Sequence, residues 1–243
     1  MDGFSLKVLA CILMLIDHIG AVFFPKVLLI RVIGRLSFPI FAFLIAEGYF
    51  RTKNLKRYIF RLIILAIISQ IPFMLAFDTK GLNIFFTLFA GIFAMMVLDK
   101  KFIVDFEIYN KKISKNIENV LNILFKIILI SLIFYLVEKL NTDYAIYGVC
   151  MILCFKIWRD KFMKLTIALI ILNAIYAISL FKYLITPYGT LNIRVFLQAT
   201  SIFSLFFIHK YNNMEGKKIQ KLFYAFYPVH LSVLILIQKF LCN

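Results

Sequence analysis

Nine long apolar segments recur along this chain, and they limit its fold more than any other feature. A helix needs about 20 mostly apolar residues to cross a bilayer. The composition agrees, because 63% of the 243 residues are hydrophobic, against about half in a soluble globular protein. We therefore predict an all-α bundle of about nine transmembrane helices, forming a single integral membrane domain over residues 1–243. The expected segments are 6–24, 27–50, 58–77, 82–98, 120–140, 144–158, 164–185, 191–209 and 221–240.

Basic residues alternate with these segments and predict the orientation of the chain. Lysine and arginine gather in cytoplasmic loops, and here the loops after the second, fourth, sixth and eighth segments are rich in them, whereas the other loops are not. This places the N-terminus in the cytoplasm and 99–119 in a cytoplasmic loop of a multi-pass protein of the cell inner (cytoplasmic) membrane. The formal charge of +16 then reflects orientation, so we expect a lipid bilayer as partner and no nucleic acid.

The cysteines give no sign of a disulfide framework or a metal site. Only Cys150 and Cys154 are close in sequence, and they share one face of an apolar segment. Together with Cys11 and Cys242 they do not form a four-ligand zinc set. We therefore predict no bound metal.

Ionisable side chains inside the apolar segments indicate a functional site, because each costs roughly 2.5–3.5 kcal/mol at bilayer depth. With a rise of ~1.5 Å per residue, His18 and Arg35 both lie about 5 to 6 Å to the outer side of the middle of their segments. His230 falls at the middle of the last segment, and Gln70 slightly outside the middle of the third. We predict that these four side chains converge with Asp17 in the central to outer part of the bilayer.

Some of these residues also have structural roles open to them. Asp17 would simply neutralise Arg35, since a buried charge is usually paired. Gln70 would satisfy backbone groups that Pro72 leaves unpaired. His230 would make a hydrogen bond between helices.

The chemistry of the set suits group transfer. Histidine removes a proton from an amine or hydroxyl near neutral pH, and a carboxylate orients it. Arg35 would stabilise an oxyanion in a low-dielectric cavity. A basic cytoplasmic rim would bind a phosphorylated donor, and for that role we select Lys7, Arg51, Lys53 and Arg57. The alternative is a proton-coupled membrane transporter, because histidines and carboxylates within membrane spans also form proton relays.

Several sequence runs resemble the TraX family, whose namesake is associated with acetylation of conjugative pilin. The runs are LKVLACILMLIDHIGAVFFP, LIRVIGRLSFPIFAFLIAEGYFRTKN, KRYIFRLIILAIISQIPF, LNIFFTLFAGI and FYAFYPVHLSVL. A looser similarity is to acyltransferase-3-type transmembrane acyltransferases, which carry a basic residue, ten residues and then a histidine in the first helix. Lys7 and His18 have that spacing, and it returns to within about 20° of the same helix face.

The resemblance implies a catalytic site and a donor. It implies that His18 is the catalytic histidine, that Asp17 is its partner, and that Arg35 and His230 belong to the same site. The implied donor is acetyl-CoA. We therefore expect a membrane-bound, acyl-CoA-dependent acetyltransferase in which His18 is the general base and Asp17 fixes its tautomer. The acceptor, a peptide N-terminus, a glycan or a lipid-linked group, stays open.

Overall fold

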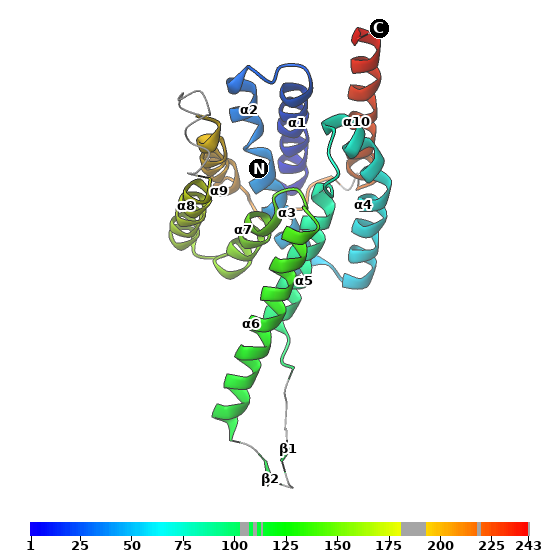
Figure 1. The fold of residues 1–243 in the computed structure, drawn as a ribbon. Helices are drawn as coiled ribbons and strands as arrows, with labels where there is room; N and C mark the ends of the chain where they lie inside the picture. The colour runs from blue at the N-terminus through cyan, green and yellow to red at the C-terminus, as the bar shows by residue number, and fades with distance from the viewer. Residues whose placement is uncertain (103–106, 109–110, 113, 181–192, 218–219, 243) are drawn as a thin grey trace.

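The computed structural model describes residues 1–102, 107–108, 111–112, 114–180, 193–217 and 220–242, and they are almost entirely helical (Figure 1). The helices are α1 Gly3–Val22, α2 Leu28–Gly34, α3 Ser37–Arg51, α4 Leu55–Phe77, α5 Ile84–Asp99, α6 Lys115–Lys139, α7 Ala145–Ile157, α8 Phe162–Ser179, the 3₁₀ helix η2 Ile193–Ser204, α9 Leu205–His209 and α10 Gln220–Cys242. Strands β1 Glu107–Ile108 and β2 Lys111–Lys112 form a small antiparallel hairpin.

The helical stretches confirm a polytopic membrane bundle. Within the described residues, six stretches are long and apolar enough to cross a membrane, and the stretch Leu28–Arg51, made of α2 and α3, is one of them. Three shorter apolar helices, Ile84–Asp99, Ala145–Ile157 and Phe196–His209, match the remaining predicted segments. The predicted end of the seventh segment at 185 and the start of the eighth at 191 lie outside the described residues.

The second predicted segment is one span with a short interruption at residues 35–36. α2 ends at Gly34 and α3 begins at Ser37. Pro39 accounts for the break, because proline lacks an N–H and its ring collides with the carbonyl four residues earlier, which belongs to Arg35. In the first turn of α3, the missing N–H leaves no helical hydrogen bond unmade. The predicted segment 27–50 is therefore one membrane-spanning stretch with a two-residue interruption, and Arg35 and Leu36 keep right-handed helical backbone angles there.

The bundle is closed by contacts between helices that are distant in sequence. α1 packs against α2, α3 and α10, α4 packs against α5 and α10, and α5 packs against α7. Small residues allow close crossings in a membrane. At Gly91 of α5, for example, an added Cβ would lie 2.3 Å from the Ile152 side chain of α7. The core includes Leu6, Ile40, Ile92 and Met151, all nearly inaccessible.

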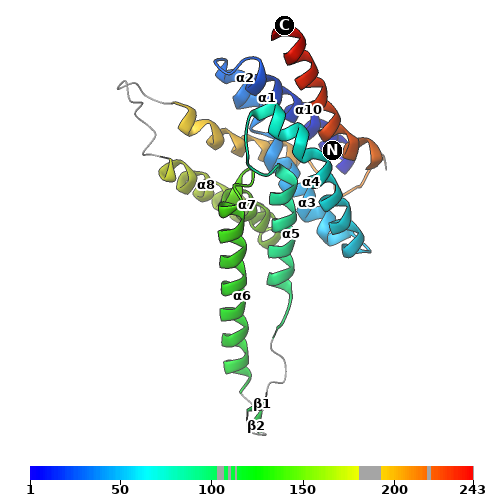
Figure 2. The ribbon, with the colours of Figure 1, turned by 45° about the vertical axis from the view of Figure 1, so that its right-hand side comes forward.

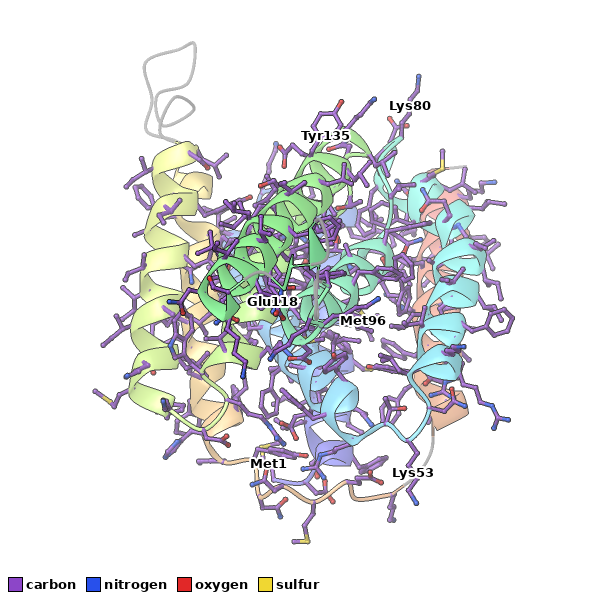
Figure 3. All side chains as sticks on the ribbon, turned by 90° about the horizontal axis from the view of Figure 1, so that it is seen from below. Met1, Lys53, Lys80, Met96, Glu118 and Tyr135 are labelled. Carbon is purple, nitrogen blue, oxygen red and sulfur yellow. The ribbon has the colours of Figure 1, made fainter. Side chains whose placement is uncertain are left out.

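The lysine- and arginine-rich loops lie at one end of the bundle, which we call the basic end. α6 begins at Lys115, five residues before its predicted start, so this helix takes up part of the expected loop 99–119. It lies beside α5, and only 11% of its apolar window is buried (Figure 2). Seen from the basic end, Met1 and Lys53 lie at the rim of the bundle (Figure 3).

Candidate functional site

Two histidines from opposite ends of the chain meet inside the bundle. His18 Nδ1 of α1 lies 2.7 Å from His230 Nε2 of α10, and His230 Nδ1 lies 2.7 Å from the Phe226 carbonyl oxygen. A carbonyl only accepts hydrogen bonds, so His230 Nδ1 carries its proton and His230 Nε2 is an acceptor. His18 Nδ1–H then donates to His230, which leaves the lone pair of His18 Nε2 available. Both tautomers are assigned from this hydrogen-bond chain.

Aromatic rings hold the two imidazoles in place. The His18 ring packs edge-on against Phe77 and Tyr227, at centroid distances of 5.0 and 6.0 Å. The His230 ring stacks on Phe226 at 4.7 Å. His230 is buried, whereas His18 is partly exposed. His18 is the imidazole of the pair that keeps a free ring nitrogen.

Asp17 is shared by two arginines of the broken second segment. Its Oδ1 lies 3.0 Å from Arg31 Nη1 and its Oδ2 lies 3.3 Å from Arg35 Nη2, while Arg31 also donates to the Asp17 backbone carbonyl at 2.7 Å. Gly34 makes this approach possible, because an added Cβ would lie 2.3 Å from Asp17 Cβ. The structure thus places Asp17 and Arg35 at one depth. Arg31, one turn before Arg35, was not among the predicted site residues.

The expected hydrogen bond between Asp17 and His18 is not what the structure shows, because the partner of His18 Nδ1 is His230. Consecutive residues project about 100° apart around a helix. Asp17 therefore faces α2, while His18 faces α4 and α10. The prediction that Asp17 sets the tautomer of His18 is wrong, and His230 occupies that position.

Arg35 extends the site toward residues that the sequence did not single out. Its Nη1 lies 3.3 Å from the Tyr144 hydroxyl and 3.4 Å from Gln198 Oε1. Gln198 in turn donates to the Tyr147 hydroxyl at 3.2 Å, and Tyr147 donates to Asn173 Oδ1 at 3.1 Å. These uncharged polar side chains stand inside apolar segments, and that was the signal available for finding them.

Gln70 lies outside the cluster. Its amide donates to the Gly81 carbonyl at 2.8 Å, and its Oε1 accepts from the backbone N–H and side-chain amide of Asn83 at 3.1 and 2.9 Å. Asn83 also caps α5 through Phe85 N–H. Gln70 therefore fixes the turn between α4 and α5, and its predicted convergence with the histidines is wrong.

The four residues predicted to bind the donor have separate surroundings. Lys7 Nζ lies 5.9 Å from the Phe223 ring centroid. Arg51 Nε donates to buried Glu47 at 3.0 Å, whereas Lys53 and Arg57 are exposed. The described contacts do not join them into one site. Among the described residues, no three histidine, cysteine, aspartate or glutamate side chains gather as metal ligands.

The comparison with known proteins decides the family. The profile of the TraX protein family matches residues 3–238. The chain belongs to the TraX family. It is 26% identical, over 99% of its length and 97% of the relative, to the probable fimbrial assembly protein FimC, serogroup H1, of Dichelobacter nodosus. It is 39% identical to an uncharacterized protein of Rickettsia prowazekii (strain Madrid E) over 35% of this chain and 33% of that one.

No solved structure matches this TraX-family chain. The paired histidines His18 and His230, together with Asp17 and Arg35, come from DHIG, GRLSFP and YPVH, which belong to the sequence runs on which the family resemblance rested. The multi-pass helical fold accords with a membrane protein.

Proposed function

We propose that this TraX-family protein is a membrane acetyltransferase that moves an acetyl group from acetyl-CoA at the basic end to an amine or hydroxyl acceptor. The observation that carries the proposal is the hydrogen-bond chain from His18 through His230 to the Phe226 carbonyl. It leaves an unprotonated ring nitrogen, Nε2, on His18, which is the state a general base requires.

In the proposed reaction, His18 Nε2 removes a proton from the acceptor as the acceptor nitrogen or oxygen bonds to the acetyl carbon. The C–S bond then breaks, and the thiolate leaves as coenzyme A after taking the proton back from His18. His230 Nε2 accepts the His18 Nδ1 hydrogen bond throughout, which favours the imidazolium form. No other co-reactant is needed for this balance.

Arg35 is the residue we assign to the developing oxyanion. Its Nε is buried and has no hydrogen-bond partner within the described part of the chain. A buried, unpaired donor is costly in a native protein, and a charged donor aimed at a developing negative charge is effective in a low-dielectric site. Asp17 holds the guanidinium of Arg35 through Nη2 and leaves Nε unused.

The relative from Dichelobacter nodosus is described as a probable fimbrial assembly protein. A pilus subunit with a free amino group is therefore the acceptor class that we favour, and the cytoplasmic membrane is the location that we propose. The reaction requires access from both sides of the bilayer. The proposed donor approaches from the basic end, and the proposed acceptor from the opposite side.

Acetyl transfer by the full chain in proteoliposomes tests the proposal. The release of free thiol from acetyl-CoA would be followed in the presence of a short peptide with a free amino terminus. We expect His18→Ala and His18→Gln to lower turnover by about 10²- to 10⁴-fold, as for loss of a general base. Ile12→Ala is the matched control, because Ile12 is half-exposed on the same helix.

Unchanged turnover in a folded His18 variant would remove this catalytic role. Solute flux driven by a pH gradient, with no thiol release and no dependence on a thioester, would favour the transporter instead.

A further inference from the structure

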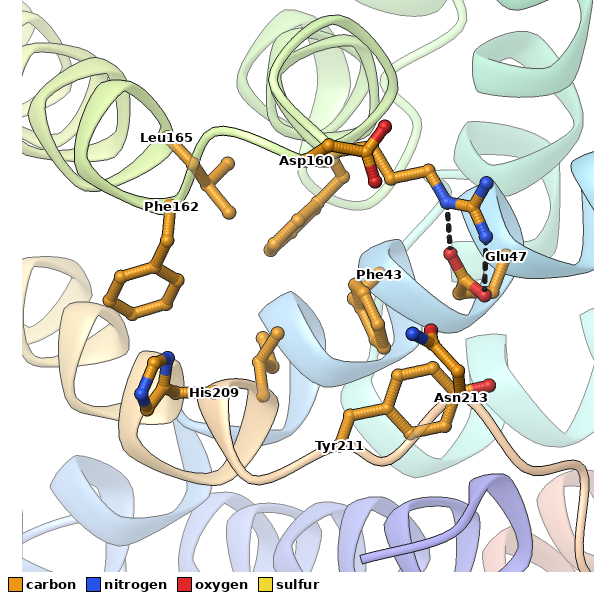
Figure 4. Close-up of a pocket in the computed structure, with 11 residues that line it drawn as sticks. Phe43, Glu47, Asp160, Phe162, Leu165, His209, Tyr211 and Asn213 are labelled. Carbon is orange, nitrogen blue, oxygen red and sulfur yellow. Dashed lines mark hydrogen bonds and ion pairs between the residues drawn. The ribbon is translucent and has the colours of Figure 1, made fainter.

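A second polar site opens at the basic end, apart from the histidine pair. It is a pocket of about 170 Å³ between the lower part of α3, the turn from α7 to α8, and the segment that follows α9 (Figure 4). Its lining combines aromatic rings with charged and amide groups: Phe43, Glu47, Phe155, Arg159, Asp160, Phe162, Leu165, Ile208, His209, Tyr211 and Asn213.

Aromatic rings from three parts of the chain form the walls of the pocket. Phe162 and His209 lie with their ring centroids 4.4 Å apart on one side, and Phe43 and Tyr211 lie 5.2 Å apart on another (Figure 4). Flat heteroaromatic ligands stack on such rings. Asn213 adds an amide that both donates and accepts hydrogen bonds, as the edge of a nucleobase requires.

Two arginines stand at the pocket, Arg159 in its lining and Arg51 beside lining residues Glu47 and Tyr211. Glu47 is 4% exposed and binds two arginines, accepting from Arg51 Nε at 3.0 Å and from Arg159 Nε and Nη2 at 2.6 and 3.1 Å. Asp160 adds a second carboxylate to the lining, and the lysines at positions 161 and 164, which follow it closely in sequence, are exposed. The arginines retain N–H groups beyond those bound to Glu47, and such groups bind phosphate well.

The size of the pocket restricts what it can hold. Pockets for whole drug-sized ligands measure roughly 300–1,000 Å³, so about 170 Å³ accommodates one ring system and leaves the rest of a ligand outside. Glu47 lies twelve residues from Arg35 along the same span, or about 18 Å at the helical rise. A long, thin ligand with its ring in the pocket would therefore reach toward the depth of Arg35.

We propose that this pocket receives the base of a nucleoside phosphate, namely the nucleotide end of the acyl donor, with the phosphates at Arg51 and Arg159. The inference rests on the proposed function. It moves the donor site away from Lys7, Lys53 and Arg57 to the opposite flank of α3. The same helices, α7 and α8, carry Tyr147 and Asn173 of the Arg35 network eight residues deeper than Phe155 and Leu165.

A lipid is the alternative ligand, and the test must distinguish it from a nucleotide. Phe162 and His209 also border a mostly apolar groove of about 420 Å³ between α8, η2 and α9. That groove would suit an acyl chain, but the walls of the polar pocket and its arginines favour a nucleotide.

Binding to the full chain in nanodiscs distinguishes these ligands. The probes are coenzyme A, adenosine 3′,5′-bisphosphate and pantetheine, which lacks the nucleotide. We expect Phe162→Ala to weaken coenzyme A and bisphosphate binding by about 5- to 150-fold, the range for loss of one stacking ring. Asn213→Asp, which is nearly isosteric, should also weaken both. Pantetheine binding should not change in either variant.

Met163→Ala is the matched control, because Met163 is 73% exposed beside Phe162 and does not line the pocket. If coenzyme A binds the wild type and both pocket variants equally, the assignment of the nucleotide to this pocket is overturned, but acetyl-CoA remains the proposed donor. If the wild type binds neither coenzyme A nor the bisphosphate, the proposed function falls as well. Loss of co-purifying phospholipid from the variants, with coenzyme A binding intact, would overturn the nucleotide assignment in favour of a lipid.

Discussion

Replacing Gly34 by alanine tests the contact on which the Asp17 cluster depends. The added Cβ would lie 2.3 Å from Asp17 Cβ and 2.6 Å from Asp17 Cα. Carbon atoms in contact are about 3.5–4.0 Å apart, so α1 and α2 must separate by about 1 Å or more. The obstructing atoms belong to the α1 backbone and its first side-chain carbon, and no rotamer change removes them.

The expected loss follows from that displacement. Overpacking costs about 1–3 kcal/mol, and the higher helix propensity of alanine returns up to about 1 kcal/mol. We expect Gly34→Ala to lower the free energy of unfolding by about 1–2 kcal/mol. The 3.3 Å contact between Arg35 Nη2 and Asp17 Oδ2 would lengthen beyond an ion pair. Because a misplacement of about 1 Å can cost about 10²-fold in rate, acetyl transfer should fall by about that factor.

Thermal unfolding in detergent and thiol release in proteoliposomes measure the two effects. Gly91→Ala is the control, because its added Cβ would lie 2.3 Å from the terminal Cδ1 methyl of Ile152, at a helix crossing between α5 and α7 that does not involve Asp17. Equal stability and equal turnover in the two variants would show that the approach of α2 to Asp17 does not position the site.

Two further predictions concern the histidine pair and the turn before α7. His230→Leu should lower acetyl transfer by about 100-fold or more, as for loss of a positioned acid–base partner, whereas His230→Gln, which keeps an acceptor for His18 Nδ1–H, should restore most of it; equal loss would refute the positioning role. Burial raises the pKa of Asp143 to about 6 from 3.8, against the opposing attraction of Arg35. The native protein therefore binds the Asp143 proton more tightly than the unfolded chain does. The contribution of protonated Asp143 to the free energy of unfolding is full below pH 3.8 and is lost as pH rises through about 6. Asp143→Asn should consequently raise the free energy of unfolding at pH 7.5 by at most about 3 kcal/mol and have little effect at pH 4. Thermal unfolding of the variant and the wild type at both pH values measures this. An effect of the substitution that is the same at both pH values would contradict the prediction.

The depth of the site residues in the membrane was predictable because it follows from their positions along each apolar segment. The rise of a helix is nearly constant, so counting residues placed His18 and Arg35 at one level, and the structure pairs Arg35 with Asp17, the neighbour of His18. The direction in which each residue faces was not predictable. The rotation of a helix about its axis depends on all its neighbours, and it turned Asp17 away from His18 and toward α2.

The hydrogen-bond partners of Arg35 were not predictable from the sequence either. Tyr144 and Gln198 belong to segments more than one hundred residues away in sequence, and only the packing of α2 against η2 and the α7 end brings them to Arg35. The break in the second segment, by contrast, had a local signal. Pro39 stands four residues after Arg35, and its ring disfavours a regular helical turn there.

The hydrogen-bond chain behind His18 has a closed end. Beyond His230 it reaches the peptide carbonyl of Phe226, and a carbonyl has no hydrogen of its own to hand on. Within the part of the chain that the structure describes, the hydrogen bonds of the two histidines lead a proton that enters at His18 back out by the same route. Such a dead-end arrangement suits a general base that takes up a proton and releases it within one turnover. A proton-coupled transporter needs a second proton route that leads to the other side of the membrane.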